Sequence, residues 1–334
     1  MALTSKAGTM PLDVSRAPGP ECFEDVACYL CGSTDHAHFQ TAQEDLTGKP
    51  GDFSFVKCDD CGLVYQQPRL TLEHIKSYYD DEYIAHRKTQ AWGPLEPFFE
   101  WLMTKLDRDK DAIVSGSIEL DSTSRVLDVG CGAGGYLMHV RKKYGARCVG
   151  VDFKELGDVI AGMGPHGRDV EFHCGTLSAV DLEPGRFDLI TMWHFLEHDY
   201  DPLETLRTAR ELLAPGGVMV IEVPRLDSLS HALYQERWPG WQAPQHTVAL
   251  DKKRFVEMLE LAGLEVSEYM PYGAYPGYFY MYAGLAFKLL EGKGIDLGKA
   301  IYSYLAGQVL LAPVIAFERR LNLSMQTVAC RARA

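Results

Sequence analysis

Short runs of β-branched and aliphatic residues alternate with longer, helix-like stretches in the middle of the chain. Strands are expected at five of these runs: Val126–Val129, Cys148–Val151, Val170–His173, Leu189–Met192 and Val218–Val223. Strands that are buried on both faces appear as nearly continuous apolar runs, and helical segments between them indicate βαβ units. The pattern therefore predicts an α/β fold, with a mostly parallel sheet and helices on both of its faces.

The flanking segments follow other patterns. A helix is expected from about Leu95 to Val114, where apolar residues recur at helical spacing. Residues 269–287 and 300–317 carry no charged side chain. Their length approaches the roughly 20 residues of a membrane span. Because both runs contain proline and glycine, and tyrosines suit a boundary that is half apolar and half wet, we expect buried or interfacial helices.

The chain divides into four parts by composition. We expect a flexible leader rich in Pro and Gly, a small cysteine-containing region, a core with the βαβ pattern, and an aromatic, apolar C-terminal helical extension. These parts are residues 1–26, 27–83, 84–265 and 266–334, in that order. The extension is expected to form a lid, a dimer interface or a membrane-facing surface.

Charge and composition narrow the function. The chain is 46% hydrophobic and 24% charged, which is ordinary for a globular protein. Its net charge of −13 argues against a nucleic-acid partner, which would require a basic surface. The first 27 residues lack the apolar core of a secretory signal, so we expect a cytoplasmic protein, with membrane association left open by the C-terminal extension.

Four of the nine cysteines form two C-x-x-C-G units. They are Cys28 with Cys31, and Cys58 with Cys61. Two such turns supply the four thiolates of a tetrahedral zinc site, and a site filled by four protein ligands is structural rather than catalytic. Four free or redox-active thiols are the alternative. A redox C-x-x-C motif, however, is expected near a βαβ pattern, which these units lack.

A glycine loop follows the first expected strand of the core. Gly130, Gly132 and Gly135 fit the dinucleotide-binding pattern G-x-G-x-x-G, which is weak evidence when it stands alone. Asp128, at the end of the strand, would repel a pyrophosphate, but it suits a cationic ligand such as a sulfonium that also carries an α-ammonium group. Asp152 ends the second strand and can accept hydrogen bonds from both hydroxyls of a ribose.

Four motifs together resemble those of the class I S-adenosylmethionine-dependent methyltransferases. They are VLDVGCGAGGYL (126–137), VGVDF (149–153), FDLITMWHFLEHDYDP (187–202) and LLAPGGVMVIEVP (212–224). The resemblance covers about residues 120–270 and implies a Rossmann-like sheet that binds S-adenosylmethionine. The two C-x-x-C-G units, CGLVYQQP (61–68), YYDDEY (78–83) and WPGWQAPQHTVAL (238–250) are similar to bacterial small-molecule methyltransferases with an N-terminal zinc ribbon.

The resemblance also implies cofactor-binding roles for particular residues. Gly130, Gly132 and Gly134 would pass under the methionine part, and Asp128 would orient its amino-acid end. Asp152 would hold the ribose. The remaining positions are Phe153 beside the adenine, Thr176 and Leu177 in a turn at the adenine edge, and Trp193 in the pocket wall. Relatives carry an acidic residue near Thr176, which this chain lacks.

Histidines supply the candidate catalytic groups. His194, Glu197 and His198 follow the fourth strand and would share one face of a helix. A general base, a metal site and a structural role all stay open for them. Ubiquinone-pathway O-methyltransferases are similar here but carry an acidic residue in place of His194. Relatives also have a histidine at the position of His246, over the active-site mouth, where it contacts the substrate or orders its own loop.

The expected reaction is methyl transfer from S-adenosylmethionine, with a histidine as general base and structural Zn²⁺ bound at the cysteines. O-methylation is expected first and C-methylation next, on a small acceptor that is apolar or linked to a lipid or sugar. A homodimer and peripheral membrane contact are further expectations from the apolar C-terminal third. Two alternatives remain: an NAD-dependent oxidoreductase, which Asp128 and LLAPGG (212–217) oppose, and a non-catalytic zinc-ribbon protein that senses the cofactor.

Overall fold

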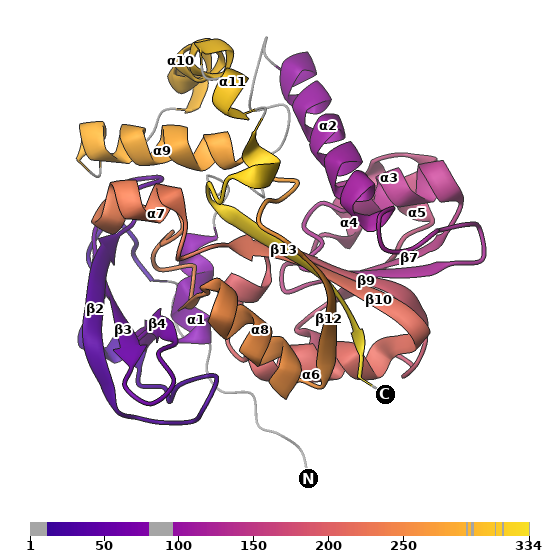
Figure 1. The fold of residues 1–334 in the computed structure, drawn as a ribbon, viewed down its shortest axis with the longest axis horizontal. Helices are drawn as coiled ribbons and strands as arrows, with labels where there is room; N and C mark the ends of the chain where they lie inside the picture. Colours follow the sequence, from indigo (N-terminus) through magenta and orange to yellow (C-terminus); the bar gives the residue numbers. More distant parts are fainter. Residues whose placement is uncertain are drawn as a thin grey trace.

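A seven-stranded sheet forms the centre of the computed structural model, which describes residues 12–79, 96–291, 293–294, 297–310, 312–315 and 317–333 (Figure 1). Its strand order is β12-β13-β10-β9-β6-β7-β8. The strands are β6 (Arg125–Val129), β7 (Arg147–Asp152), β8 (Glu171–Cys174), β9 (Phe187–Trp193), β10 (Leu213–Pro224), β12 (Leu264–Met270) and β13 (Met325–Ala332). The five expected strands are confirmed as a parallel block, and β13 runs antiparallel to both of its neighbours.

Helices cover both faces of this sheet, as the apolar pattern predicts (Figure 1). One face carries α6 (Pro202–Leu212) and α8 (Lys252–Leu261). The other carries α2 (Glu96–Val114), α3 (Gly135–Tyr144) and the short α4 (Gly157–Gly162) and α5 (Pro165–Arg168). Local sequence fixes the beginnings of α6 and α8, because Asp201 and Asp251 accept hydrogen bonds from the backbone amides of Glu204 and Arg254.

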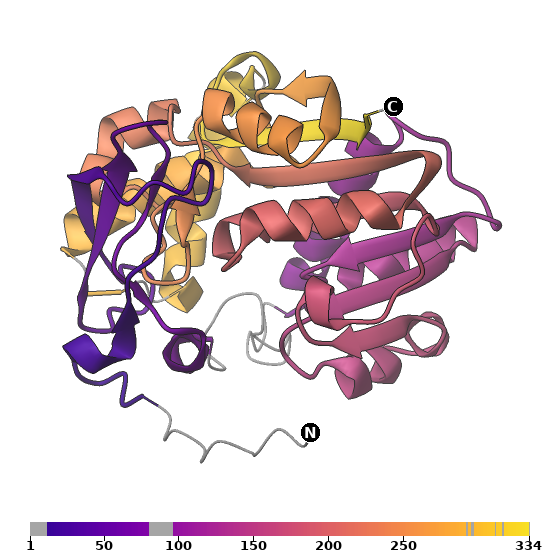
Figure 2. The same ribbon diagram turned by 90° about the horizontal axis from the view of Figure 1, so that it is seen from below.

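A second, four-stranded sheet stands beside the large one (Figure 2). Three of its strands come from the cysteine-containing region: β2 (His36–Gln43), β3 (Asp52–Cys58) and β4 (Val64–Gln66). The fourth is β11 (Val248–Ala249), which pairs with β4 although it lies far along the chain. The region 27–83 is therefore not self-contained, because residues assigned to the core complete its sheet.

The prediction of a flexible leader at residues 1–26 is wrong for the C-terminal end of that segment, which is folded. The segment η1 (Pro20–Cys22) precedes β1 (Phe23–Glu24), which pairs with β5 (Arg69–Leu70), and the short helices α1 (Leu72–Ile75) and η2 (Lys76–Tyr78) follow β5. Burial explains why this part of the leader is folded, because Cys22 is 3% exposed and Phe23 packs against Phe53. Residues 1–11 lie outside the described residues, as do residues 80–95 with the boundary between positions 83 and 84.

The C-terminal extension is also corrected in part. Its helices α9 (Gly277–Leu290), α10 (Leu297–Leu310) and α11 (Ala312–Ile315) are inserted between β12 and β13, two strands of the large sheet. The extension therefore combines helices with sheet strands, since β13 fills the place between β10 and β12. Within the described ranges, no helix is long and apolar enough to cross a membrane.

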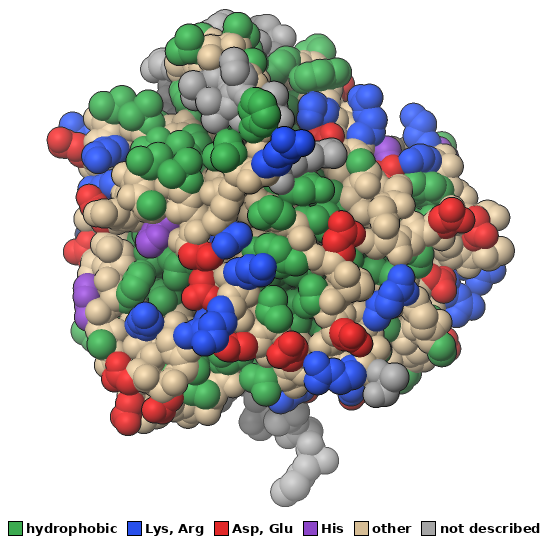
Figure 3. Space-filling view, in the orientation of Figure 1, with side chains coloured by type: hydrophobic (Ala, Val, Ile, Leu, Met, Phe, Trp, Pro, Cys, Tyr) green, Lys and Arg blue, Asp and Glu red, His purple; other side chains and the backbone are tan. Residues whose placement is uncertain are grey.

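Part of the inserted region leaves apolar side chains in solvent. Tyr278, Tyr282 and Tyr304 pack together where α9 meets α10. Hydrophobic side chains gather on the surface around α9 and α7 (Leu229–Tyr234), in the upper part of Figure 3. Leu289 on α9 and Leu310 on α10 are 73% and 79% exposed. A lid, a dimer interface and a membrane-facing surface all stay predictions for this region.

Candidate functional site

The glycine loop turns sharply between β6 and α3, at the carboxyl edge of the large sheet. Gly130, Gly132 and Gly134 all have positive φ, at 73°, 51° and 74°. The ring of Phe195 closes over the first of them, because a Cβ atom on Gly130 would lie 2.4 Å from it. Glycine is required there both for the backbone conformation and for this close approach.

Asp128 lies directly before this loop and is 4% exposed. Its carboxylate accepts a hydrogen bond from the hydroxyl of Thr191 at 2.6 Å. Burial raises the pKa of Asp128 to about 6, against the charge of Lys110 and the Thr191 hydrogen bond, which lower it. The structure therefore places a buried carboxyl group at the end of β6, where the sequence predicts an anion for a cationic ligand.

Helix α2 adds residues that sequence reasoning missed. Lys110 lies 5.7 Å and 5.4 Å from the ring centres of Tyr136 and Trp193. Asp107 reaches the start of α3, since a Cβ on Gly135 would lie 3.3 Å from its carboxylate. The apolar spacing of this helix does not single out these charged residues, and the packing of α2 against α3 brings them to the glycine loop.

Two polar groups beside Asp128 lack partners. The indole Nε1 of Trp193 and the hydroxyl of Tyr136 are buried and make no hydrogen bond within the described part of the chain. Buried polar groups are nearly always paired in native proteins, so an unpaired pair of donors next to a buried carboxyl group favours a polar ligand. This surrounding, with Lys110, fits the amino-acid end of S-adenosylmethionine.

Asp152 is 6% exposed at the end of β7. Its two carboxylate oxygens accept hydrogen bonds from the amides of Gly132 at 2.9 Å and Lys154 at 3.0 Å. Asp152 thus holds the glycine loop itself, and a ribose would share its oxygens with these amides. Phe153 is 39% exposed at the next position, with its ring 5.0 Å from that of Tyr79.

The predicted adenine-edge turn is joined to the same strand end, because the amide of Gly175 donates to the carbonyl of Asp152 at 2.8 Å. Thr176 is exposed in this turn, and its hydroxyl lies 3.4 Å from that of Ser178. Leu177 begins η5 (Leu177–Ala179), and its side chain packs in the core with 2% exposure. The side chain of Leu177 is therefore part of the core rather than of the surface of the turn.

His194 is held by carboxylates on both sides. Its Nδ1 lies 3.2 Å from Glu197, and its Nε2 lies 2.9 Å from Glu222, which sequence reasoning missed. Burial alone would lower the pKa of His194, but the hydrogen bonds to these two carboxylates raise it to about 9. His194 is therefore a fixed cation at neutral pH, which suits charge balance better than proton abstraction.

Glu197, His198 and His246 form a second group at this edge. One donor atom from each lies within 4.8 Å of the others, so the three could hold a divalent ion. Glu197 and His198 belong to η6 (Leu196–His198), whereas His246 comes from the loop before β11. Glu197 is thus shared: it contacts His194, which also contacts Glu222, and it lies beside His198 and His246.

Both histidines of this group are neutral at pH 7. Burial lowers the pKa of His198 and of His246 to about 3. The Nδ1 of His246 lies 2.8 Å from the carbonyl of Gly240, which fixes the ring proton on Nδ1 and leaves the Nε2 lone pair as an acceptor. The hydroxyl of Tyr79 lies 3.0 Å from the Nδ1 of His198, so Tyr79 connects His198 with Phe153.

The small sheet holds the loop of His246. The side-chain amide of Gln66, on β4, donates to the carbonyls of Pro244 and His246 at 3.1 Å and 3.0 Å. Trp241 buries its ring against Phe55 of β3, with the ring centres 4.6 Å apart. The aromatic residues of WPGWQAPQH therefore anchor the loop on the small sheet.

The four predicted zinc ligands are brought together. The sulfur atoms of Cys28, Cys31, Cys58 and Cys61 lie within 4.8 Å of one another, and none is in a disulfide. Both C-x-x-C turns close with an amide of the following glycine, Gly32 or Gly62, bonded to the carbonyl of the first cysteine. Four thiols that converge from two turns fit a closed, tetrahedral zinc site.

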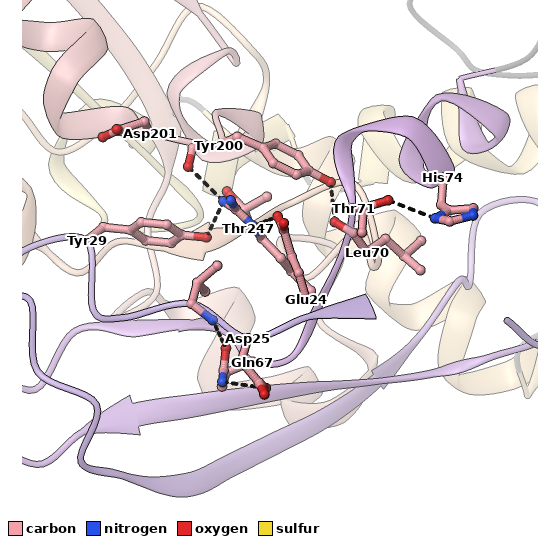
Figure 4. A network of polar contacts seen from close by, with 12 residues as sticks. Glu24, Asp25, Tyr29, Gln67, Leu70, Thr71, His74, Tyr200, Asp201 and Thr247 are labelled. Atoms are coloured by element: carbon pink, nitrogen blue, oxygen red, sulfur yellow. Dashed lines mark hydrogen bonds and ion pairs between the residues drawn. The ribbon is translucent and has the colours of Figure 1, made fainter. Parts of the chain in front are cut away.

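Arg69, on β5, joins the β1–β5 strand pair to the segment that follows η6. Its guanidinium donates to Glu24 at 2.8 Å, to the hydroxyl of Tyr29 at 2.9 Å and to the carbonyl of Tyr200 at 2.7 Å. Figure 4 shows Glu24, Tyr29 and Tyr200 converging on this point. The hydroxyl of Tyr200 in turn donates to the carbonyl of Leu70, so the segment after η6 is fixed against β5.

Comparisons with known proteins agree with this geometry. A family model described as a methyltransferase domain matches residues 99–269. A ubiquinone biosynthesis O-methyltransferase of Xanthomonas campestris pv. campestris is 33% identical over 141 residues, covering 41% of this chain and 56% of the relative. One from Aromatoleum aromaticum is 32% identical over 138 residues, covering 40% and 56%. The chain thus spans little more than half the length of these curated relatives.

Solved structures show similar folds at low identity. A methyltransferase from Mesorhizobium loti that depends on S-adenosylmethionine has a TM-score of 0.46 and 16% identity, covering 68% of this chain and 99% of that one. A geranyl diphosphate C-methyltransferase from Streptomyces coelicolor has a TM-score of 0.45 and 10% identity, covering 67% and 78%. Resemblances at this level decide nothing about the acceptor.

Proposed function

Because the chain belongs to the methyltransferase-domain family, in the class I S-adenosylmethionine-dependent group, we propose that it methylates a hydroxyl oxygen of a small biosynthetic intermediate. The carrying observation is the buried Asp128 beside Lys110 and the unpaired donors of Trp193 and Tyr136. A carboxylate and an ammonium group at one strand end complement the α-ammonium and α-carboxylate groups of the cofactor. The buried carboxylate would repel the pyrophosphate of a nicotinamide cofactor, so a nicotinamide-dependent oxidoreductase is disfavoured.

S-adenosylmethionine supplies a methyl group that is activated by positively charged sulfur. The chain itself has to hold this cofactor, align the acceptor and take its proton. We assign the cofactor to the glycine loop with Asp128, Lys110 and Asp152. His246 is the proposed general base, because its Nε2 keeps a lone pair while Gly240 holds its Nδ1 proton.

His198 and Glu197 would orient and balance the charge of His246 once it gains the proton. The ring centres of His198 and His246 lie 4.4 Å apart, and one oxygen of Glu197 is buried without a hydrogen-bond partner among the described residues. That unpaired oxygen is available to a protonated imidazole. His194 is excluded as the base in this proposal, because two carboxylates keep it protonated.

An apolar, ring-hydroxyl acceptor is the proposed substrate class. The names of the curated relatives point to quinone-like intermediates. In addition, aromatic residues extend toward α9 from the proposed catalytic edge, which is the edge of the large sheet that carries His194, Glu197 and His246. His194 meets Tyr275 with ring centres 5.0 Å apart, and Tyr275 meets Phe279 at 5.4 Å. C-methylation and a lipid- or sugar-linked acceptor stay second, and cytoplasmic location, a homodimer and membrane contact stay predictions.

We propose one structural zinc ion at the four cysteines. The support is the convergence of four sulfur atoms from two C-x-x-C-G turns. Its role follows from the sheet, since β3 ends at Cys58 and β4 carries Gln66, which holds the His246 loop. The ion would stabilise the small sheet and, through it, the position of the proposed base.

The variant His246→Ala tests this function. We expect methyl transfer to a panel of ring-hydroxylated acceptors to fall at least about 100-fold, the scale of a lost general base. The dissociation constant for S-adenosylhomocysteine should stay within about twofold of wild type, because the cofactor residues lie on other elements. Turnover is measured as S-adenosylhomocysteine formed, and the dissociation constant by calorimetry.

The matched control is His166→Ala, an exposed histidine on α5, which should leave both quantities unchanged. A large loss of cofactor binding in His246→Ala would contradict the assignment. Cofactor binding without transfer to any acceptor by the wild type would favour the non-catalytic alternative, and binding of NADH alone would favour the oxidoreductase.

A further inference from the structure

A second, positively charged hollow lies at the edge of the large sheet opposite the proposed active site. Its volume is about 230 Å³. Arg125 begins β6, Arg147 begins β7, and Arg186 directly precedes β9. These are the amino ends of the strands whose carboxyl ends carry Asp128, Asp152 and Trp193, so the hollow is separate from the cofactor site.

Among the residues that line the hollow, guanidinium groups outnumber carboxylates. Four arginines line it, namely the three above and Arg141 of α3, against the two carboxylates of Asp169 and Glu171, which leaves a surplus of two positive charges. This surplus contrasts with the net charge of −13 of the whole chain. A local excess of guanidinium groups in an acidic protein marks a place where an anion is favoured.

Two of the four guanidinium groups have no partner among the described residues and are available to a ligand. Arg141 donates to the carbonyls of Gly145 and Ala146 and lies 3.3 Å from Asp169. Arg186 lies 3.8 Å from Glu171 and 3.9 Å from Glu183, which stands outside the lining. The side chains of Arg125 and Arg147, by contrast, make no hydrogen bond or ion pair with any residue that the structure describes.

The chemistry of the lining indicates the ligand. Guanidinium groups match the oxygens of phosphate in pairs and stay charged at every physiological pH. The volume is somewhat below the roughly 300–1,000 Å³ of pockets for drug-sized ligands, so a small ligand is favoured. Val149 and Phe187 supply an apolar part of the lining that can contact a short carbon chain.

We propose that this hollow binds the phosphate group of a small phosphate-bearing molecule. The available groups of Arg125 and Arg147 would hold the phosphate oxygens, and Arg141 and Arg186, already engaged by carboxylates and carbonyls, would shape the site. This site does not depend on the proposed methyl transfer.

Calorimetric titration of the zinc-loaded full chain tests the site, with inorganic phosphate and glycerol 3-phosphate as probes and sodium chloride at equal ionic strength as reference. The chain is first saturated with S-adenosylhomocysteine, which keeps phosphate from the glycine loop. We expect saturable binding of one phosphate per chain, and none of chloride. Tighter binding of glycerol 3-phosphate would indicate a phosphate ester as the natural ligand, and equal or weaker binding would indicate free phosphate.

The variants Arg147→Gln and Arg125→Gln should each weaken binding at least 10-fold. Arg207→Gln is the matched control, because Arg207 is a half-exposed arginine on α6 that lies 3.9 Å from Glu204. Thermal unfolding and zinc content establish that each variant is folded. Equal responses to phosphate and chloride, or an equal loss in Arg207→Gln, would overturn the proposal. Phosphate binding that occurs only without S-adenosylhomocysteine would also overturn it.

Discussion

Asp128 shows how burial adjusts a single carboxyl group to a cationic ligand. Its position at a strand end is readable from the sequence, but its pKa of about 6 is a consequence of the surrounding protein. Burial penalises the charged form, and Lys110 with the Thr191 hydroxyl recovers part of that cost. Asp128 is therefore largely ionised at pH 7 and largely neutral at pH 5.

Cofactor affinity should consequently depend on pH through Asp128. Because the ionised carboxylate is the form that attracts an ammonium group, affinity should fall as pH falls through 6. We expect the dissociation constant for S-adenosylhomocysteine to rise about 10-fold from pH 7 to pH 5, as the ionised fraction drops. In Asp128→Asn the affinity should be weak at both pH values and nearly constant. Calorimetry at half-unit steps measures this.

Asp181→Asn, an exposed carboxyl group outside the site, is the control and should keep the wild-type dependence. A wild-type affinity that is independent of pH between 5 and 7, or a persisting dependence in Asp128→Asn, would show that another group governs binding.

The contacts of His194 and His198 show what residue spacing in the sequence does not determine. Positions 194, 197 and 198 were expected to share a helical face, yet His194 adopts φ of 53° directly after β9, and only residues 196–198 form a short 3-10 turn. This backbone turns His194 toward Glu222 on the neighbouring strand. The partner of each histidine is thus set by strand order, which residue spacing does not encode.

At the scale of elements, the pairing of β11 with β4 connects the cysteine-containing region with the proposed catalytic edge. The pairing of Val248 with Tyr65 places His246 two residues from the small sheet. Gln66 then fixes the loop with two hydrogen bonds from its side chain. A structural ion at the cysteines would in this way act on the proposed base without contacting it.

Removal of the proposed zinc ion should therefore impair turnover more than cofactor binding. Treatment with a chelator, or the variant Cys58→Ser, is expected to lower methyl transfer at least about 10-fold, while affinity for S-adenosylhomocysteine changes by less than about threefold, since the cofactor residues lie on the large sheet. Elemental analysis measures the zinc content, and methyl transfer and the affinity for S-adenosylhomocysteine are measured on the same samples.

Cys174→Ser, an exposed cysteine outside the cluster, should retain both zinc and activity. A Cys58→Ser protein that has lost its zinc but transfers methyl groups at the wild-type rate would exclude this coupling.

At the scale of the whole molecule, Arg69 connects the β1–β5 strand pair with Tyr200, in the segment between η6 and α6. Its side chain is 11% exposed, and its guanidinium carbon lies 4.1 Å from the ring centre of Tyr200 in addition to its three hydrogen bonds. Hydrogen bonds to a charged group that is shielded from solvent stabilise more than neutral ones. The contact between the β1–β5 strand pair and the segment before α6 therefore depends on this side chain.

The variant Arg69→Gln should lower the free energy of unfolding by about 2 kcal/mol, because the carbonyl of Tyr200 and the hydroxyl of Tyr29 lose their charged donor. Urea unfolding of the zinc-loaded protein measures the change, and zinc content should stay at the wild-type level. Arg207→Gln should change the free energy of unfolding by less than about 0.5 kcal/mol. Equal stabilities of the two variants would show that Arg69 does not secure this contact.

The sequence by itself determined the parallel block of the sheet, the glycine loop, the end-of-strand position of Asp128 and the four converging cysteines. Each of these rests on a local pattern, such as an apolar run, a glycine spacing or a C-x-x-C turn, which short-range geometry translates directly into structure. The strands β12 and β13 escaped prediction, because they pair directly with each other although α9, α10 and α11 separate them along the chain.

Only the tertiary structure decided which groups meet at the catalytic edge. Lys110 arrives with α2, Glu222 with the neighbouring strand β10, Tyr79 with the cysteine region and His246 through β11. Each contact joins residues far apart in the chain, and its existence depends on strand order and helix packing rather than on local preference. The same packing fixed the charge states, because burial and neighbouring charges make His194 a cation and keep His246 neutral.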